Sequence, residues 1–437
     1  MIDLFNNSNI YLIIFVMLWV FSLIIYKKVK KQYDAGFIIL ASFLLYSIFS
    51  LLLYNDPFYK SEFGKLKLFP FIYLFSMIIL TCLPIFKYDQ NKIVKIQRPS
   101  KLLINSLAYF IILNSILYIP ENIGRVYSGF ILMMMDSSAG LDVYKETLEN
   151  MSQSGMGTTI SNIPGVFTNL FSDISKLLLF YYLTLNDKKN KFIIIGLSIT
   201  AVWSMFNGVA LSQRGIVINC AMTILISYYA VKRFINKKYE KTIKSIGLGL
   251  VILISIPLVA ITIARFDRSS EGGLLSSVYF YAGQENLIFN EYGLDNNGLR
   301  HGDRTFPMFK RALGFDNVPN NFFERRAKYP NLRVNDEHFI GYVGDFTLDY
   351  GGFVTPFIFL FFTLIFIRMT KVKSGNLLFS QLLIIHFVMC ICFQGGMKLF
   401  SYADTGNLKI ILVFILSLLF YIDYLSQNNR STKNINR

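Results

Sequence analysis

The strongest constraint on the fold of this chain is its series of long apolar windows. Each holds about 18 or more mostly apolar residues, the length that an α-helix needs to cross a hydrocarbon core of about 30 Å. Eleven windows occur, near residues 10–26, 36–54, 68–86, 102–119, 163–185, 192–211, 214–231, 245–264, 352–369, 377–397 and 408–425. Because backbone polar groups must be satisfied inside a bilayer, such segments cross it as helices. The pattern predicts an all-α, polytopic integral membrane protein of about 11 transmembrane helices, with residues 1–437 forming a single membrane domain.

The composition excludes the soluble alternatives. Of the 437 residues, 54% are hydrophobic and 16% are charged, and the mean hydropathy is +0.46. Soluble domains average roughly 25% charged residues, so a soluble multidomain enzyme, a disordered chain and a disulfide scaffold are all excluded. The four cysteines fall inside apolar windows, which favours small buried hydrophobic residues over disulfides or metal ligands.

Basic residues alternate from one connecting segment to the next. Segments 27–35, 87–101, 186–191, 232–244, 368–376 and 426–437 together hold 24 Lys and Arg residues, whereas 55–67, 120–162, 212–214 and 398–409 hold 8. Cytoplasmic loops of membrane proteins are enriched in Lys and Arg. The bias predicts that the N-terminus lies outside and the C-terminus lies in the cytoplasm. The net charge of +16 is then mostly a signal of topology, and no nucleic-acid partner is expected.

Two long segments lie on the predicted outer side, residues 265–338 and residues 120–162. Long loops on one face commonly carry function. The larger loop holds eight of the fifteen arginines in the chain, namely Arg265, Arg268, Arg300, Arg304, Arg311, Arg325, Arg326 and Arg333. The planar arginine fork suits phosphate and carboxylate, so the enrichment indicates an anion site at the outer membrane surface. The alternative is that these arginines pair with the ten acidic residues of the same loop.

Arginines also adjoin the apolar windows. Arg214 lies in Ser212-Gln-Arg-Gly215, between two windows with almost no loop between them. A charge at that depth should face a polar cavity or an anionic headgroup, unless it extends to the interface. Arg265 ends the eighth window, and Arg268 would follow one helical turn later on the same face.

A second cluster of polar residues precedes the window at 352–369. If residues 335–352 are helical, Asp345 and Asp349 share one face, with His338 on that face as well. This arrangement could hold a base over a substrate, or the carboxylates could pair with the loop arginines and cap the helix. His301 lies in a polar turn between two arginines and could bind substrate or shuttle protons.

Several common chemistries lack their motifs. The sequence has no phosphate-binding glycine loop, no His-Glu-x-x-His, no Gly-x-Ser-x-Gly and no His/Cys/Asp set with metal-ligand spacing. Metal-dependent mechanisms and nucleotide hydrolysis are therefore disfavoured, and no metal or other cofactor is expected.

Three stretches carry a resemblance to a known family: Ser212-Gln-Arg-Gly215, the arginine-rich segment 265–338, and Asp345-Phe-Thr-Leu-Asp-Tyr-Gly-Gly352. Together with the architecture, they resemble the Wzy-type polysaccharide polymerases, which are distantly similar to O-antigen ligases. In many of these proteins a His-Asn pair lies about nine residues before the acidic residue. Here His338 lies eleven residues before Asp349 and is followed by Phe339.

The resemblance implies a GT-C-like architecture with a large extracytoplasmic loop in the bacterial inner (cytoplasmic) membrane. It implies a metal-independent glycosyltransferase of O-antigen, capsule or lipopolysaccharide biosynthesis, which moves a growing glycan from undecaprenyl diphosphate onto the next lipid-linked repeat unit. The expected catalytic residues are Arg214, Arg265, His338 and Asp345. The expected residues for binding the diphosphate or glycan are Arg268, Arg300, His301, Arg304, Asp349 and Tyr350.

The partners expected from this resemblance are an undecaprenyl-diphosphate-linked oligosaccharide, membrane lipids and, as a further candidate, a chain-length regulator protein. Two alternative functions stay open. One is an O-antigen ligase-like glycan transferase, and the other is a flippase or transporter of lipid-linked oligosaccharides.

Overall fold

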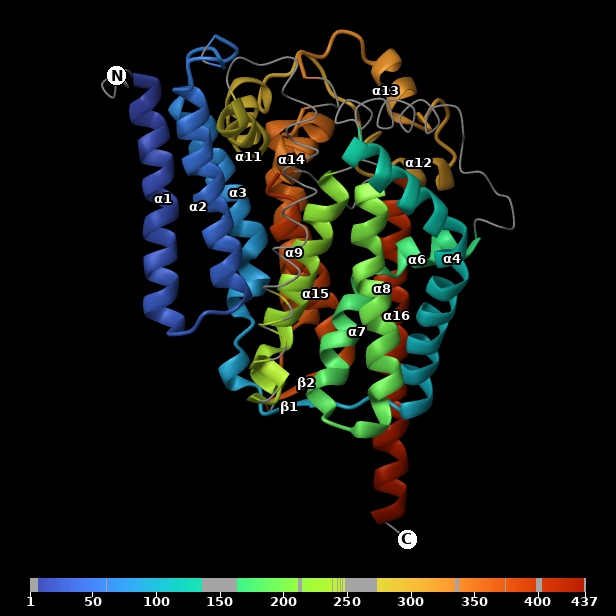
Figure 1. Cartoon of the computed structure of the whole chain (residues 1–437). Coiled ribbons are helices and arrows are strands. Elements are labelled where there is room, and N and C mark those ends of the chain that lie inside the picture. The colour runs from blue at the N-terminus through green and yellow to red at the C-terminus, as the bar shows by residue number, and fades with distance from the viewer. Residues whose placement is uncertain are drawn as a thin grey trace. The chain divides into compact units, whose positions relative to one another are not determined.

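The structure of the protein is a computed structural model that describes residues 7–59, 61–135, 163–210, 214–237, 239–241, 243, 245, 247, 273–334, 338–373, 375–397 and 403–435. Over these residues the chain is almost entirely helical, with two strands of three residues each (Figure 1). The chain divides into two compact units. Unit 1 comprises Met1–Asp89, Ser269–Met369 and Phe387–Ile410, and unit 2 comprises Gln90–Arg268, Thr370–His386 and Ile411–Arg437.

The elements are distributed over both units. Unit 1 contains α1 (Asn7–Lys30), α2 (Ala35–Tyr54), α3 (Leu68–Lys87), α11 (Gly273–Tyr292), α12 (Pro307–Ala312), α13 (Phe322–Lys328) and α14 (Gly341–Met369). Unit 2 contains α4 (Lys101–Met135), α6 (Ile163–Leu170), α7 (Ser172–Leu185), α8 (Lys191–Ala210) and α9 (Arg214–Val231), the 3-10 helices η1 (Gln90–Lys92), η3 (Lys188–Asn190) and η4 (Lys232–Phe234), and the strands β1 (Lys95–Gln97) and β2 (Asn376–Leu378). Helices α15 (Phe379–Gln394) and α16 (Ala403–Ile435) each supply residues to both units.

The first three helices of unit 1 pack through aromatic side chains. Trp19 of α1 is fully buried, with its ring stacked on Phe43 of α2 at 5.0 Å and edge-on to Phe75 of α3 at 4.8 Å. Asp34 begins α2 as its N-cap, because its carboxylate accepts a hydrogen bond from the Phe37 amide at 3.0 Å. The Tyr26 hydroxyl donates to the same carboxylate at 2.9 Å and so ties the end of α1 to the start of α2.

Helix α11 packs closely against α2 and is seen nearly end-on in Figure 1, where α1, α2 and α3 are seen from the side. A Cβ atom at Gly283 would lie 2.6 Å from the Phe49 backbone, so only glycine allows this approach. Ser50 fixes the contact, because its Oγ donates to the Gly283 carbonyl at 2.7 Å and accepts from the Asn286 amide at 2.9 Å. The segment predicted as a large loop therefore contains a 20-residue helix.

Helix α14 is two helices joined at a break. Gly351 has a φ of +83° and a ψ of 158°, a backbone conformation that favours glycine. The part before the break carries both aspartates of the predicted cluster, and the part after it coincides with the apolar window at 352–369. Tyr73 of α3 holds the break, since its hydroxyl donates to the Gly352 carbonyl at 2.8 Å.

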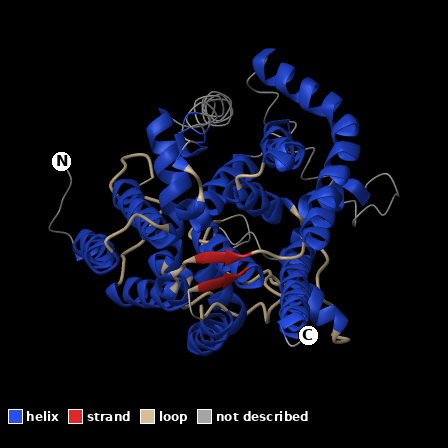
Figure 2. Ribbon diagram, turned by 90° about the horizontal axis from the view of Figure 1, so that it is seen from below, coloured by secondary structure: helices blue, strands red, loops and turns tan. Residues whose placement is uncertain are grey.

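Unit 2 is built around α4, α7, α8 and α9, in which α8 packs against each of the other three helices and α7 also packs against α9. The side chain of Gln90 caps the C-terminal end of α9, because its amide donates to the carbonyls of Tyr229 at 2.6 Å and Ala230 at 3.1 Å. Strands β1 and β2 pair in parallel with Ile96 opposite Leu377 (Figure 2).

Among the described residues, seven helices are long and apolar enough to cross a membrane. They are Asn7–Lys30, Ala35–Tyr54, Leu68–Lys92, Lys101–Pro120, Gly215–Phe234, Gly341–Met369 and Asp404–Asn429. The pair α6 and α7, bent by 59°, makes an eighth if it is one span. These helices confirm the prediction of an all-α membrane protein, whereas the count of eleven spans and their orientation remain predictions.

Three predicted windows lack a counterpart among these spans. Those at 192–211 and 377–397 are occupied by α8 and by the 16-residue α15. The window at 245–264 lies almost wholly outside the described residues, as do positions 136–162 of the second predicted loop. The first part of that loop continues α4 to Met135.

Candidate functional site

Four charged side chains of the predicted site form a buried cluster in unit 1. Arg300 Nε lies 2.7 Å from Asp349 Oδ1, and Arg304 Nε lies 2.5 Å from Asp345 Oδ1. Arg300 Nη2 also lies 3.4 Å from Asp345 Oδ1. None of the four residues is more than 3% exposed. We call Arg300, Arg304, Asp345 and Asp349 the ion-pair cluster, and its two positive and two negative charges balance.

The ion-pair cluster joins a tight turn to the first part of α14. His301 and Gly302 have φ angles of +53° and +83°, which reverse the chain between the two arginines. The Arg300 amide donates to the Leu348 carbonyl at 2.9 Å, and the amide and hydroxyl of Thr305 both donate to Asp349 Oδ2 at 2.8 Å. The turn is therefore fastened to the helix by backbone as well as by charge.

Asp345 and Asp349 lie on one face of α14, as their i, i+4 spacing predicts, since both contact Arg300. Tyr350 adjoins this face, with its hydroxyl 3.2 Å from the Thr305 Oγ1. Of the two roles considered for these aspartates, pairing with loop arginines is the one that their contacts with Arg300 and Arg304 match. Asp345 is held by both guanidinium groups, so these contacts suit it to positioning.

A second charged centre lies beside the ion-pair cluster. The fully buried carboxylate of Asp303 accepts hydrogen bonds from Lys310, from Lys328 at 2.6 Å and from the Tyr329 hydroxyl at 2.8 Å. Burial alone would raise the pKa of Asp303, but the hydrogen bonds from Lys310, Lys328 and Tyr329 outweigh it and hold that pKa below its usual value. Burial, together with the hydrogen bond to the same carboxylate, raises the pKa of Tyr329. Asp303 therefore stays ionised and holds α12 and α13 to the turn.

An arginine-lined cavity of about 500 Å³ opens next to these two centres. We call it the arginine pocket, and it is lined by Arg300, Phe323, Arg325, Arg326, Ala327, Tyr329, Pro330, Leu332, Arg333 and Val334. Arg300 belongs both to its wall and to the ion-pair cluster. Four of the ten lining residues are arginines and none is acidic, so the cavity is suited to an anion.

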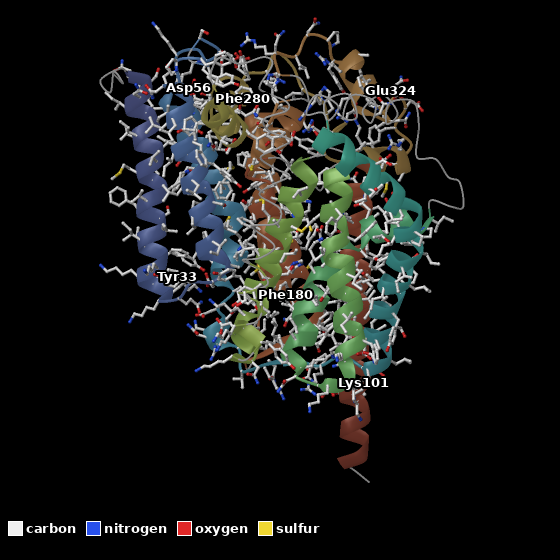
Figure 3. The ribbon with its side chains drawn as sticks, viewed as in Figure 1. Tyr33, Asp56, Lys101, Phe180, Phe280 and Glu324 are labelled. Carbon is white, nitrogen blue, oxygen red and sulfur yellow. The ribbon has the colours of Figure 1, made fainter. Side chains whose placement is uncertain are left out.

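Short-range contacts explain how α13 presents its arginines. Asn321 caps the helix, because its side chain accepts from the Glu324 amide at 2.9 Å, and Glu324 in turn accepts from the Asn320 amide at 2.8 Å. Glu324, Asp56 and Phe280 lie at one end of unit 1, and Tyr33 lies at the other (Figure 3). The arginine pocket is thus at the end of unit 1 opposite the basic turn that follows α1.

The remaining predicted site residues are placed less completely. His301 and His338 are exposed, and His301 lies in the turn of the ion-pair cluster. Arg214 begins α9, while its side chain lies outside what the structure describes. Arg265 and Arg268 lie outside the described residues.

The sequence did not single out Glu285, although the structure gives it an unusual setting. This residue of α11 is 2% exposed, and neither carboxylate oxygen has a hydrogen-bond partner among the described residues. Burial raises the pKa of the Glu285 carboxyl well above its usual range. One turn earlier on α11, the Tyr281 ring packs edge-on against Phe339, the neighbour of His338, at 5.1 Å. A buried carboxylate without a hydrogen-bond partner among the described residues can be recognised only in the folded chain.

Metal ligands do not gather in the described parts of the chain, where no group of three or more His, Cys, Asp or Glu side chains could hold an ion. Comparison of the sequence with protein-family models and with curated proteins, and of the structure with solved structures, finds no match.

Proposed function

We propose that the protein is a polysaccharide repeat-unit polymerase that transfers a growing glycan from undecaprenyl diphosphate onto the next lipid-linked repeat unit. The observation that carries the proposal is the arginine pocket in a chain with at least seven membrane-length helices. Its volume of about 500 Å³ falls in the range of ligand sites, roughly 300–1,000 Å³. Its lining contains four arginines and no acidic residue. Arg300 and Arg333 pair with carboxylates outside the lining, and we assign the anionic group to Arg325 and Arg326.

The position of the arginine pocket supports a lipid-linked substrate. The pocket lies at the end of unit 1 away from the Lys27–Lys31 turn, which the alternation of basic loops predicts to be cytoplasmic. A polyprenyl diphosphate has its anionic group at the membrane surface and its hydrocarbon in the bilayer. The arginines of the pocket suit the diphosphate, and the apolar helices of unit 1 suit the hydrocarbon chain.

The transfer needs charge stabilisation and a proton acceptor. The acceptor sugar's hydroxyl oxygen would bond to the anomeric carbon of the donor, while the bond from that carbon to the diphosphate oxygen breaks and its electron pair leaves with the diphosphate. Arginines of the pocket would stabilise this developing charge. The hydroxyl proton would pass to a base, for which His338 is our candidate, because Asp345 is held by Arg300 and Arg304.

The test is chain extension by purified, reconstituted protein given a defined undecaprenyl-diphosphate-linked repeat unit. Arg326→Ala removes an exposed guanidinium of the pocket and should lower extension at subsaturating donor about tenfold, since a charged hydrogen bond contributes about 1.5–3 kcal/mol. Arg326→Lys should recover only part of the loss, because the fork is gone. The matched control is Arg368→Ala, an exposed arginine in the last turn of α14.

The outcomes separate the candidate functions. Lengthened glycan with wild-type protein and loss in Arg326→Ala alone supports the polymerase. Transfer to a different acceptor without lengthening points to a ligase-like enzyme, and lipid movement without transfer points to a flippase. Wild-type extension by both Arg326→Ala and Arg325→Lys would overturn the assignment of the diphosphate to this pocket.

A further inference from the structure

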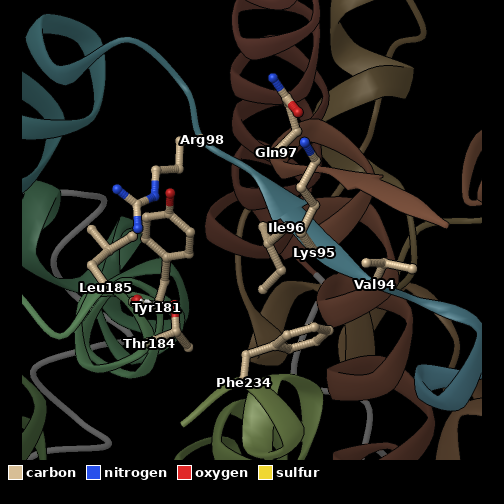
Figure 4. Close-up of a pocket in the computed structure, with 9 residues that line it drawn as sticks. All are labelled: Val94, Lys95, Ile96, Gln97, Arg98, Tyr181, Thr184, Leu185 and Phe234. Carbon is tan, nitrogen blue, oxygen red and sulfur yellow. Dashed lines mark hydrogen bonds between the residues drawn. The ribbon is translucent and has the colours of Figure 1, made fainter. Parts of the chain in front are cut away.

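Unit 2 contains a second cavity, of about 460 Å³, whose lining is also basic. Its walls come from β1 with the residues on either side of it, from the last turns of α7, and from η4 (Figure 4). Lys95 and Arg98 are its two charged residues, and the lining contains no acid. Gln97 and Thr184 add polar groups, and Ile96, Leu185 and Phe234 add apolar ones.

The two cations lack a carboxylate partner. Both side chains are exposed, and in the portions of the chain that the structure describes no Asp or Glu oxygen lies within ion-pair distance of either. Figure 4 shows the Arg98 guanidinium next to the phenol oxygen of Tyr181, a residue of α7 that is 1% exposed. The Arg98 guanidinium and the Tyr181 phenol oxygen therefore lie together, Lys95 extends beside Gln97 in the same lining, and none of the lining residues is an acid.

The cavity lies where membrane helices end. The bent pair α6 and α7 finishes at Leu185, the candidate span Gly215–Phe234 finishes at Phe234, and α4 begins at Lys101, three residues after Arg98. Helix ends of this kind meet the boundary between hydrocarbon and water, where phospholipid phosphates are found. The adjoining segments carry further cations at Lys188, Lys189, Lys191, Lys232 and Arg233.

We propose that this cavity binds the phosphate of an anionic phospholipid headgroup, with Arg98 and Lys95 as its charged contacts and the apolar wall against the glycerol and upper acyl chain. The absence of an acid from the lining disfavours a zwitterionic headgroup, whose ammonium would meet two cations and no anion. A basic pocket between helix ends is a known form of headgroup site. The inference does not depend on the proposed polymerase activity.

The experiment is native mass spectrometry of the full-length protein taken from vesicles that contain equal amounts of phosphatidylglycerol and phosphatidylcholine. The wild-type protein should retain one phosphatidylglycerol in preference to phosphatidylcholine. Arg98→Gln should lower its retention about tenfold, Lys95→Gln should lower it less, and Arg98→Lys should lie between wild type and Arg98→Gln. The matched control is Lys189→Gln, an exposed lysine outside the lining, which should retain lipid as wild type does.

A second arm identifies the source of the phosphate. Inorganic phosphate at millimolar concentration should leave lipid retention unchanged if the glycerol and acyl contacts contribute. Displacement of the lipid by inorganic phosphate would overturn the lipid assignment in favour of a soluble phosphate compound. Equal retention by wild type, Arg98→Gln and Lys95→Gln, or no preference for phosphatidylglycerol, would overturn the site itself.

Discussion

Substitution of Asp349 by alanine tests whether the ion-pair cluster holds unit 1 together. The Asp349 side chain is fully buried and has three close contacts, with Arg300 Nε at 2.7 Å and with the Thr305 amide and hydroxyl at 2.8 Å each. After its removal, Arg300 keeps its contacts to Asp345, to the carboxylate at 3.4 Å and to the backbone carbonyl at 3.1 Å, but loses the short ion pair at Nε. Removing one partner of a buried pair costs about 3–5 kcal/mol, because the other charge stays desolvated.

The four cysteines provide the assay. Cys82, Cys220, Cys390 and Cys392 are all buried and form no disulfide, so a thiol-reactive fluorophore reacts with them as the purified protein unfolds on heating. Asp349→Ala should unfold at a clearly lower temperature than wild type. The control is Arg333→Ala, which breaks an ion pair whose side chains are 50% and 72% exposed and should cost less than about 1 kcal/mol.

A double variant separates the loss of a contact from the burial of an unpaired charge. Arg300→Met with Asp349→Leu removes both charges and should recover much of the stability lost in Asp349→Ala, as apolar replacements of buried pairs do. Extension activity should stay low, because Arg300 also lines the arginine pocket. Equal melting temperatures of Asp349→Ala and Arg333→Ala would contradict this role of the ion-pair cluster. So would a double variant whose loss of stability equals the summed losses of the two single variants.

Three more results are expected. Glu285→Gln should stabilise the protein more at pH 8 than at pH 5 in the same melting assay. The folded Glu285 carboxyl keeps its proton, whereas the unfolded chain releases it above the ordinary pKa of 4.5, so the stability of the wild-type protein falls as pH rises. Equal effects of the substitution at both pH values would contradict this. Reporter fusions within residues 280–330 should be active outside the cytoplasm, and cytoplasmic activity would reverse the predicted topology. Chain extension should survive excess EDTA, whereas loss that Mg²⁺ or Mn²⁺ restores would recast Asp345 and Asp349 as metal ligands.

The sequence predicts the parts of the fold that depend on local pattern. Apolar windows predict most of the spanning helices, since length and hydropathy decide that property within one segment. The shared face of Asp345 and Asp349 follows from helical spacing in the same way. The apolar windows do not predict helix α11. Its apolar residues are interrupted by four polar ones, so no continuous apolar window covers it; the four are Gln284, Glu285, Asn286 and Asn290.

Pairing between distant residues lies beyond such patterns. Arg300 and Asp349 are 49 positions apart. The sequence offers eight loop arginines to the ten acids of the loop and to Asp345 and Asp349, and it does not show which of them will pair. The structure commits Arg300 and Arg304 to carboxylates and places Arg325 and Arg326 in the cavity wall. Glu285 was missed for the same reason, since its burial depends on α2, more than 200 residues earlier.

The turn that holds Arg300 and Arg304 forms contacts with a part of the chain that is synthesised much later. The Thr305 carbonyl accepts a hydrogen bond from Asn407 at 2.7 Å, and Arg311 pairs with Asp404. Asn407 follows Thr305 by about 100 residues, which a ribosome adds in roughly 5–20 s. Throughout that interval the arginine-rich segment has emerged without these two partners. The end of unit 1 that contains the arginine pocket must therefore complete its folding late in synthesis, after the start of α16 has emerged.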